Sequence, residues 1–196
     1  MTQKPKPIKA KDKILAAASD LFYRQGYQAT VVNQIINASG VSKPTFYTHY
    51  KSKEELCLIY LKEQHALQLN VTNDIIRSQK TPYDRFMASI KFLEDRVVSL
   101  NYRGCAFFNV IAEIGDPENA IFKEAINFNN NIKAILKNVT LDLIQSEPKY
   151  KDLDADYISD TYYIILSGAI VAAQEYRDTW PFKRSVKAIE KLIDVK

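Results

Sequence analysis

The residues best suited to chemistry lie close together, in the stretch GVSKPTFYTHYKSK that runs from Gly40 to Lys53. If this stretch is helical, one face carries hydroxyl, amine and imidazole groups, which belong to Lys43, Thr45, Tyr47, Thr48 and His49. Such groups form hydrogen bonds with phosphate oxygens and with the edges of bases. A helix beginning after Ser42 would also direct backbone N–H groups and a positive dipole toward phosphate. The pattern therefore indicates nucleic-acid binding.

Three short helices must position these groups. The first is expected from about Lys9 to Gln25, with an apolar stripe of Ile14, Leu15, Ala18, Leu21 and Phe22. The second is expected over about 31–38, with Thr30 as its N-cap. Gly40 permits a sharp turn, and the third helix then starts at the N-cap Ser42 and ends near Tyr50. A short helix, a turn and a second short helix form a helix-turn-helix, whose second helix fits the major groove of DNA.

The rest of the chain also has helical signals. Ser52 and Glu55 form a capping box, which opens a fourth helix that reaches about Ser78. Further helices are expected over about 81–100, 105–114, 116–146, 154–177 and 181–194. We find no convincing alternating strand. The sequence therefore predicts an all-α fold of about nine helices, in which a three-helix DNA-binding domain precedes a helical body.

Charge and composition narrow the function. Residues 1–53 hold nine Lys or Arg against two Asp, whereas the whole chain carries a net charge of only +4. A basic head suits a polyanion. No nucleophile–base pair, paired carboxylates or phosphate-cradling glycine loop is recognisable, so we expect no enzyme, no cofactor and no metal site. The two cysteines, Cys57 and Cys105, are expected to be buried thiols, with redox sensing as the alternative. Without an export signal or a membrane span, the chain is expected in the cytoplasm.

The stretch KILAAASDLFYRQGYQATVVNQIINASGVSKPTFYTHYKSKEEL resembles the DNA-binding domain of the TetR family of transcriptional regulators. The resemblance covers about residues 9–64 and is sharpest from Gly40 to Lys53. It implies residues 9–69 as the DNA-binding domain with the start of a connecting helix, and 70–196 as an effector-binding and dimerisation domain. Residues 1–8 hold two prolines and no periodicity, which indicates a flexible basic arm. The arm is expected to contact DNA, with a solvated tail as the alternative.

The resemblance also implies roles for single residues. The expected DNA-binding set is Thr30, Asn33, Ser42, Lys43, Pro44, Thr45, Tyr47, His49 and Lys53. Within this set Lys43, Pro44 and Thr45 match the first turn of the recognition helix, and Lys53 matches a phosphate-binding lysine. Two positions depart from the family pattern: Val31 stands where Ser or Thr often touches phosphate, and Asn33 stands where arginine is common. These departures put the contribution of the second helix in doubt.

For the body the resemblance implies a homodimer held by the last two helices, a palindromic operator and an unknown small-molecule effector. An effector would bind among aromatic and polar side chains, for which we name Phe86, Phe107, Phe108, Asn109, Phe128 and Tyr163. The same aromatics could be plain core. The leading interpretation is a repressor that the effector releases from its operator. The alternative is a DNA-binding protein of the same fold that a protein partner controls.

Overall fold

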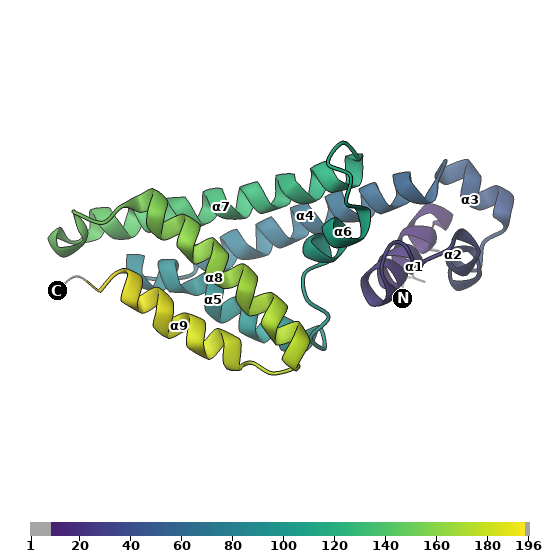
Figure 1. Ribbon diagram of the computed structural model, residues 1–196. Helices are drawn as coiled ribbons and strands as arrows, with labels where there is room; N and C mark the ends of the chain where they lie inside the picture. Colours follow the sequence, from purple (N-terminus) through teal and green to yellow (C-terminus); the bar gives the residue numbers. More distant parts are fainter. Residues whose placement is uncertain (1–8, 195–196) are drawn as a thin grey trace, which may run out of the picture. The chain divides into compact units, whose positions relative to one another are not determined.

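A computed structural model describes residues 9–194, and within that range the chain forms α-helices and one 3-10 turn, with no strand (Figure 1). The elements are α1 (Ala10–Gln25), α2 (Val32–Ser39), α3 (Lys43–His49), α4 (Lys53–Arg77), α5 (Pro82–Ser99), α6 (Ala106–Ile114), α7 (Ala120–Ser146), η1 (Pro148–Tyr150), α8 (Ala155–Tyr176) and α9 (Trp180–Leu192). The expected all-α fold is confirmed. The expected basic arm, residues 1–8, lies outside the described residues. Between residues 9 and 194, no helix is both long and apolar enough to cross a bilayer.

Most helices begin where local sequence predicts. The side chains of Ser42, Thr81 and Asp154 each accept a hydrogen bond from a backbone N–H in the first turn of α3, α5 and α8. The start of α7 differs, because Asp116 accepts the N–H of Glu118 in a separate turn. The helix begins four residues later than expected, after Asn119 accepts the N–H of Ile121 at 2.8 Å.

The start of α2 also differs. The N-cap is Val31, so the expected cap at Thr30 is wrong. Val31 has no side-chain acceptor, and the side chain of Gln34 compensates by accepting the Val31 N–H at 2.9 Å. The Thr30 hydroxyl donates instead to the carbonyl of Gly26 at 2.6 Å, inside the turn that precedes α2.

The chain divides into two compact units. The first holds the residues up to Gln64 together with Ala106–Ala125, and the second holds His65–Cys105 together with the residues from Ile126 onward. The grouping differs from a simple division along the sequence, because α6 and the start of α7 belong with the N-terminal helices.

The first unit is built on a core shared by its short helices. Ile14, Ile35 and Phe46 come from α1, α2 and α3, and all three are fully buried. Phe22 of α1 packs against Tyr60 of α4 with ring centroids 5.9 Å apart. A helix of seven residues such as α3 is not stable alone in water, so these contacts maintain it.

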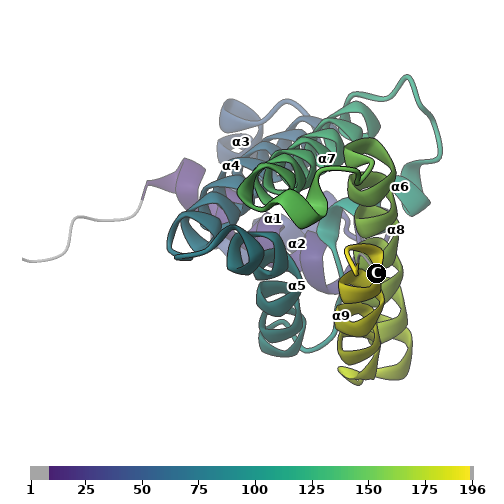
Figure 2. The same ribbon diagram turned by 90° about the vertical axis from the view of Figure 1, so that its left-hand side faces the viewer.

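In the second unit, α5, α8 and α9 lie side by side (Figures 1 and 2). The rings of Phe86 and Tyr162 pack with centroids 5.0 Å apart, and both side chains are fully buried. The Tyr162 hydroxyl donates to the backbone carbonyl of Phe86 at 2.8 Å, which satisfies the phenol without water. Burial raises the pKa of Tyr162, so this hydroxyl stays protonated at physiological pH.

Candidate nucleic-acid interface

Helix α3 has one exposed polar face and one buried face. The side chains of Lys43, Pro44, Tyr47, Thr48 and His49 are exposed, together with the N-cap Ser42, and Thr45 is half-buried. On the opposite side Phe46 and Tyr50 are fully buried. The structure therefore brings six of the expected DNA-binding residues, from Ser42 to His49, onto one short helix and its cap.

The buried face fixes the orientation of α3. Phe46 and Tyr50 lie one turn apart with ring centroids at 6.2 Å, and the Tyr50 hydroxyl donates to the backbone carbonyl of Lys11 in α1 at 3.2 Å. At the other end, the Ser42 hydroxyl accepts the N–H of Thr45 at 3.2 Å and lies 2.7 Å from the Thr45 hydroxyl. Both ends of α3 are thus held by specific hydrogen bonds.

Helix α2 and its turns place α3 beside α1. Ile35 is buried in the core, and Gly40 ends α2 with a φ of +66°, a backbone angle that side-chain-bearing residues rarely adopt. Asn33, an expected DNA-binding residue, is exposed on α2. Val31 is also exposed at the start of this helix. The α2–turn–α3 arrangement is a helix-turn-helix, as the spacing predicts.

Two expected DNA-binding residues lie elsewhere. Thr30 is fully buried. Its hydroxyl donates to the carbonyl of Gly26 and accepts a hydrogen bond from Gln25 Nε2 at 3.1 Å. Its side chain is therefore removed from the candidate interface. The cause is the turn after α1, which directs Thr30 inward to satisfy its own backbone.

Lys53 lies at the start of α4 and is half-buried. Its Nζ donates to the carbonyls of Tyr27 and Thr30, at 2.9 Å each, and lies 4.2 Å from the centroid of the Tyr27 ring. Burial lowers the pKa of this ammonium, and the nearby Glu113 carboxylate opposes that shift. Two of the three N–H groups of Lys53 thus serve the turn after α1, a role that the sequence does not reveal.

The expected effector-binding residues are divided between the two units. Phe107, Phe108 and Asn109 are on α6 in the first unit, whereas Phe86, Phe128 and Tyr163 belong to the second. Phe128 contacts His65 edge-to-face at 5.4 Å. An open groove of about 610 Å³ lies on the second unit, and its lining is Tyr83, Lys149, Tyr150, Lys187, Glu190, Lys191, Ile193 and Asp194. None of the six expected residues lines that groove.

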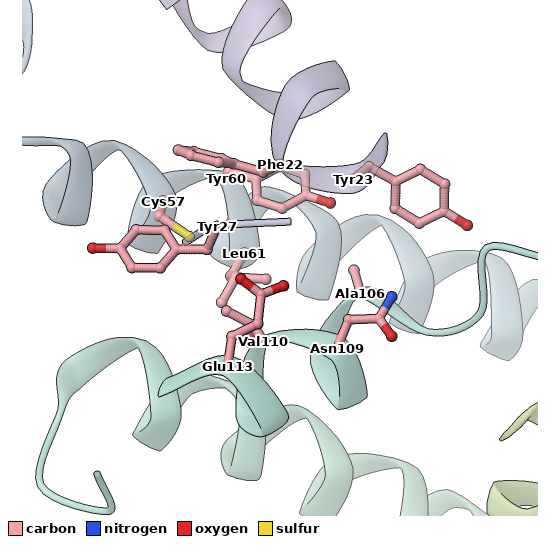
Figure 3. Close-up of a pocket in the computed structure, with 10 residues that line it drawn as sticks. All are labelled: Phe22, Tyr23, Tyr27, Cys57, Tyr60, Leu61, Ala106, Asn109, Val110 and Glu113. Atoms are coloured by element: carbon pink, nitrogen blue, oxygen red, sulfur yellow. The ribbon is translucent and has the colours of Figure 1, made fainter. Parts of the chain in front are cut away.

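Asn109 lines a small cavity in the first unit, together with Phe22, Tyr23, Tyr27, Cys57, Tyr60, Leu61, Ala106, Val110 and Glu113 (Figure 3). Its volume is about 10 Å³, which holds at most one water molecule and is far below that of a ligand site. Burial raises the pKa of the Cys57 thiol beside it to about 12. This cavity is therefore a packing feature with an unreactive thiol.

Comparison with known proteins connects the helix-turn-helix to a family. Residues 14–58 match the family described as bacterial regulatory proteins of the tetR family. An HTH-type transcriptional regulator in the lacX 3' region of Lactococcus lactis subsp. lactis is 30% identical over 110 residues, which cover 53% of this chain and 54% of that protein. The HTH-type transcriptional regulator QacR of Staphylococcus aureus is 48% identical over 56 residues, which cover 29% of this chain and 30% of QacR.

The likeness in fold extends further than the likeness in sequence. A TetR-family transcriptional regulator from Streptomyces coelicolor matches with a TM-score of 0.84 and 20% identity, over 94% of each chain. By contrast, the sequence match spans about half of the length of the Lactococcus regulator and less than a third of the length of QacR. The family match over residues 14–58, the HTH-type relatives and the shared all-α fold together support a TetR-family transcriptional regulator.

Proposed function

We propose that this protein is a sequence-specific, DNA-binding transcriptional repressor that acts in the cytoplasm. The observation that carries the proposal is the face of α3 formed by Ser42, Lys43, Tyr47 and His49, which is exposed while the opposite face is buried. Lys43, in the first turn, would read base edges, and Tyr47 and His49 would contact the DNA backbone. Asn33 and the third N–H group of Lys53 would add backbone contacts. The family and the fold are those of non-enzymatic regulators.

We further propose that the protein works as a homodimer. On α8 an apolar stripe repeats every seven residues and remains exposed: Tyr157 is 63% exposed, Ile164 67% and Val171 53%. A stripe with this spacing lies on one face of a helix and suits a partner helix. Gly168, between Ile164 and Val171, permits close approach. A second copy of the chain is the occupant that DNA reading requires, because one short recognition helix reads too few bases and a two-fold pair reads a palindrome.

The experiment that tests DNA binding is selection from a random pool of duplexes, read by sequencing. We expect enrichment of one palindromic sequence, with half-sites about 34–36 Å apart or a multiple of that spacing. The matched control is a Tyr47→Ala, His49→Ala double variant, which leaves the core of α3 intact. Equal enrichment by both proteins, or none by the wild type, would contradict the proposal.

Control of the repressor is proposed to depend on a small molecule bound among the aromatic side chains of the C-terminal body. Phe86 and Phe128 are buried apolar residues of that body, and Tyr163 is half-buried. Asn131 places a polar group beside His65, with Nδ2 and Nε2 3.2 Å apart. The effector would reduce operator affinity, and linkage requires operator DNA to weaken effector binding by the same factor. A screen that finds compounds raising the melting temperature but never changing operator affinity would favour control by a protein partner.

A further inference from the structure

A carboxylate on α6 holds the turn between α1 and α2. The backbone N–H of Gln28 donates to Glu113 Oε2 at 2.7 Å, across 85 positions in the sequence. The Gln28 side-chain amide also approaches the backbone carbonyl of Glu113, at 3.5 Å. Figure 3 shows the Glu113 side chain extending from α6 toward Tyr27, the residue between Gly26 and Gln28. Hydrogen bonds to an ionised acceptor are about twice as strong as neutral ones, so this contact is a firm attachment.

Lys53, which carries the opposite charge to Glu113, binds the same turn. Its ammonium takes the carbonyls of Tyr27 and Thr30, at 2.9 Å each, while Glu113 takes the N–H of Gln28. One backbone donor of the turn therefore faces a carboxylate, and two backbone acceptors face an ammonium. Three of the four residues from Tyr27 to Thr30 are bound by two charged side chains from two different helices.

Gly26 makes the approach of Glu113 possible. Gly26 has a φ of +97°, and a β-carbon at this position would lie 2.4 Å from Glu113 Oε1. The carboxylate thus occupies the space that any other side chain would take. Gly26 is also the C-cap residue of α1, and its N–H donates to the carbonyl of Phe22, so the Glu113 carboxylate adds a contact from α6 to a turn that begins at a helix end.

The position of this turn matters for α3. Thr30, at its end, directly precedes Val31, the N-cap of α2, and α2 leads through Gly40 into α3. A displacement of the turn would move α2 and the recognition helix as one piece. The contact therefore offers a route by which α6 can act on DNA binding without contacting DNA.

We propose that Glu113 is a positioning residue for the recognition helix, and that it acts through the Gln28 N–H and the space left by Gly26. The proposal rests on the proposed DNA-binding function. If the Glu113 carboxylate lay at the DNA, it would repel phosphate, and its removal would strengthen operator binding. As a positioning residue it has the opposite effect, because its removal frees the turn and weakens binding.

The test combines amide exchange in the DNA-free protein with operator affinity at several salt concentrations. Glu113→Ala removes the acceptor, whereas Glu113→Gln retains an acceptor oxygen and loses the charge. Glu118→Ala is the matched control, since Glu118 is an exposed carboxylate of the same unit that pairs with Lys123. Exchange of the buried α1 amide of Ala18 reports global opening.

For Glu113→Ala we expect exchange of the Gln28 amide to accelerate about tenfold or more while that of Ala18 is unchanged. Operator affinity should fall about tenfold, with the same dependence on salt. Glu113→Gln, which keeps an acceptor oxygen but loses the charge, should fall between the wild type and Glu113→Ala in both measurements. Glu118→Ala should match the wild type.

Unchanged or tighter operator binding by Glu113→Ala would overturn the proposal, as would equal acceleration at Gln28 and Ala18. If Glu113→Ala does not fold, Glu113→Asp, one methylene shorter, must show the same changes in the same direction. If the wild type selects no DNA, the proposed function fails, but the exchange measurement still decides whether Glu113 holds the turn.

Discussion

Lys43 is the single side chain from which we expect the most sequence information. It is exposed in the first turn of α3, one residue after the N-cap Ser42. Lysine and arginine in this setting donate to the O6 and N7 atoms of guanine. A contact of this kind distinguishes guanine from the other bases, whereas a contact with phosphate carries no sequence information.

Lys43→Ala should therefore relax the preference at one position in each half-site, with a loss of about 1–3 kcal/mol of discrimination. Sequencing of DNA selected by the variant measures the effect. Lys91→Ala, an exposed lysine on α5, is the control for the change in net charge. If both variants select the wild-type sequence, Lys43 does not read a base.

Cys57 should be inert in the folded protein. The side chain is 1% exposed, and desolvation raises the pKa of its thiol to about 12. Only the thiolate reacts, so at pH 8 modification by a disulfide reagent should be at least about a thousandfold slower than for free cysteine. The measurement uses a Cys105→Ser background and a urea-unfolded control. Rapid modification under native conditions would support the alternative of redox sensing.

At the scale of the element, α3 depends on its cap because it is too short to be stable alone. Ser42 is that cap, and its hydroxyl accepts the N–H of Thr45. Ser42→Ala should lower the free energy of unfolding by about 1 kcal/mol and weaken operator binding.

Ser42→Asp separates the two roles of this position. Aspartate caps helices as well as serine does, so stability should be retained, but its charge would repel DNA phosphates. Thermal unfolding and operator titration of both variants check this expectation. Retained affinity in Ser42→Asp would mean that the cap of α3 does not lie near phosphate.

At the scale of the whole molecule, assembly depends on the exposed stripe of α8. Ile164→Asp places a charge in the proposed interface, where it has no partner, and should yield a species of about one 22.5 kDa chain by light scattering. Operator affinity should fall with it, because palindrome recognition needs two heads. Leu67→Asp, at a leucine of α4 that is 54% exposed, is the matched control and should remain dimeric. A wild type that is monomeric at micromolar concentration yet binds its operator tightly would refute the dimer.

Local sequence determined the elements and most of the candidate interface. Ser42, Thr81 and Asp154 each act within one helical turn, so their capping roles follow from neighbours in the chain. The shared burial of Phe46 and Tyr50 likewise follows from the helical period, which places residues four positions apart on one face. This is why the fold class and the polar face of α3 could be predicted from the sequence alone.

Only the tertiary structure decided which side chains form hydrogen bonds with the turn after α1. Thr30 looked like an N-cap at the DNA surface, but the inward turn of the backbone buried it. Lys53 is expected from the resemblance to bind phosphate, but two carbonyls from more than 20 positions away accept hydrogen bonds from its ammonium. Glu113 carried no signal at all, since its partner lies 85 positions earlier and no periodicity links residues at that separation. Patterns along a chain report short-range geometry, whereas contacts between distant segments depend on how the helices pack.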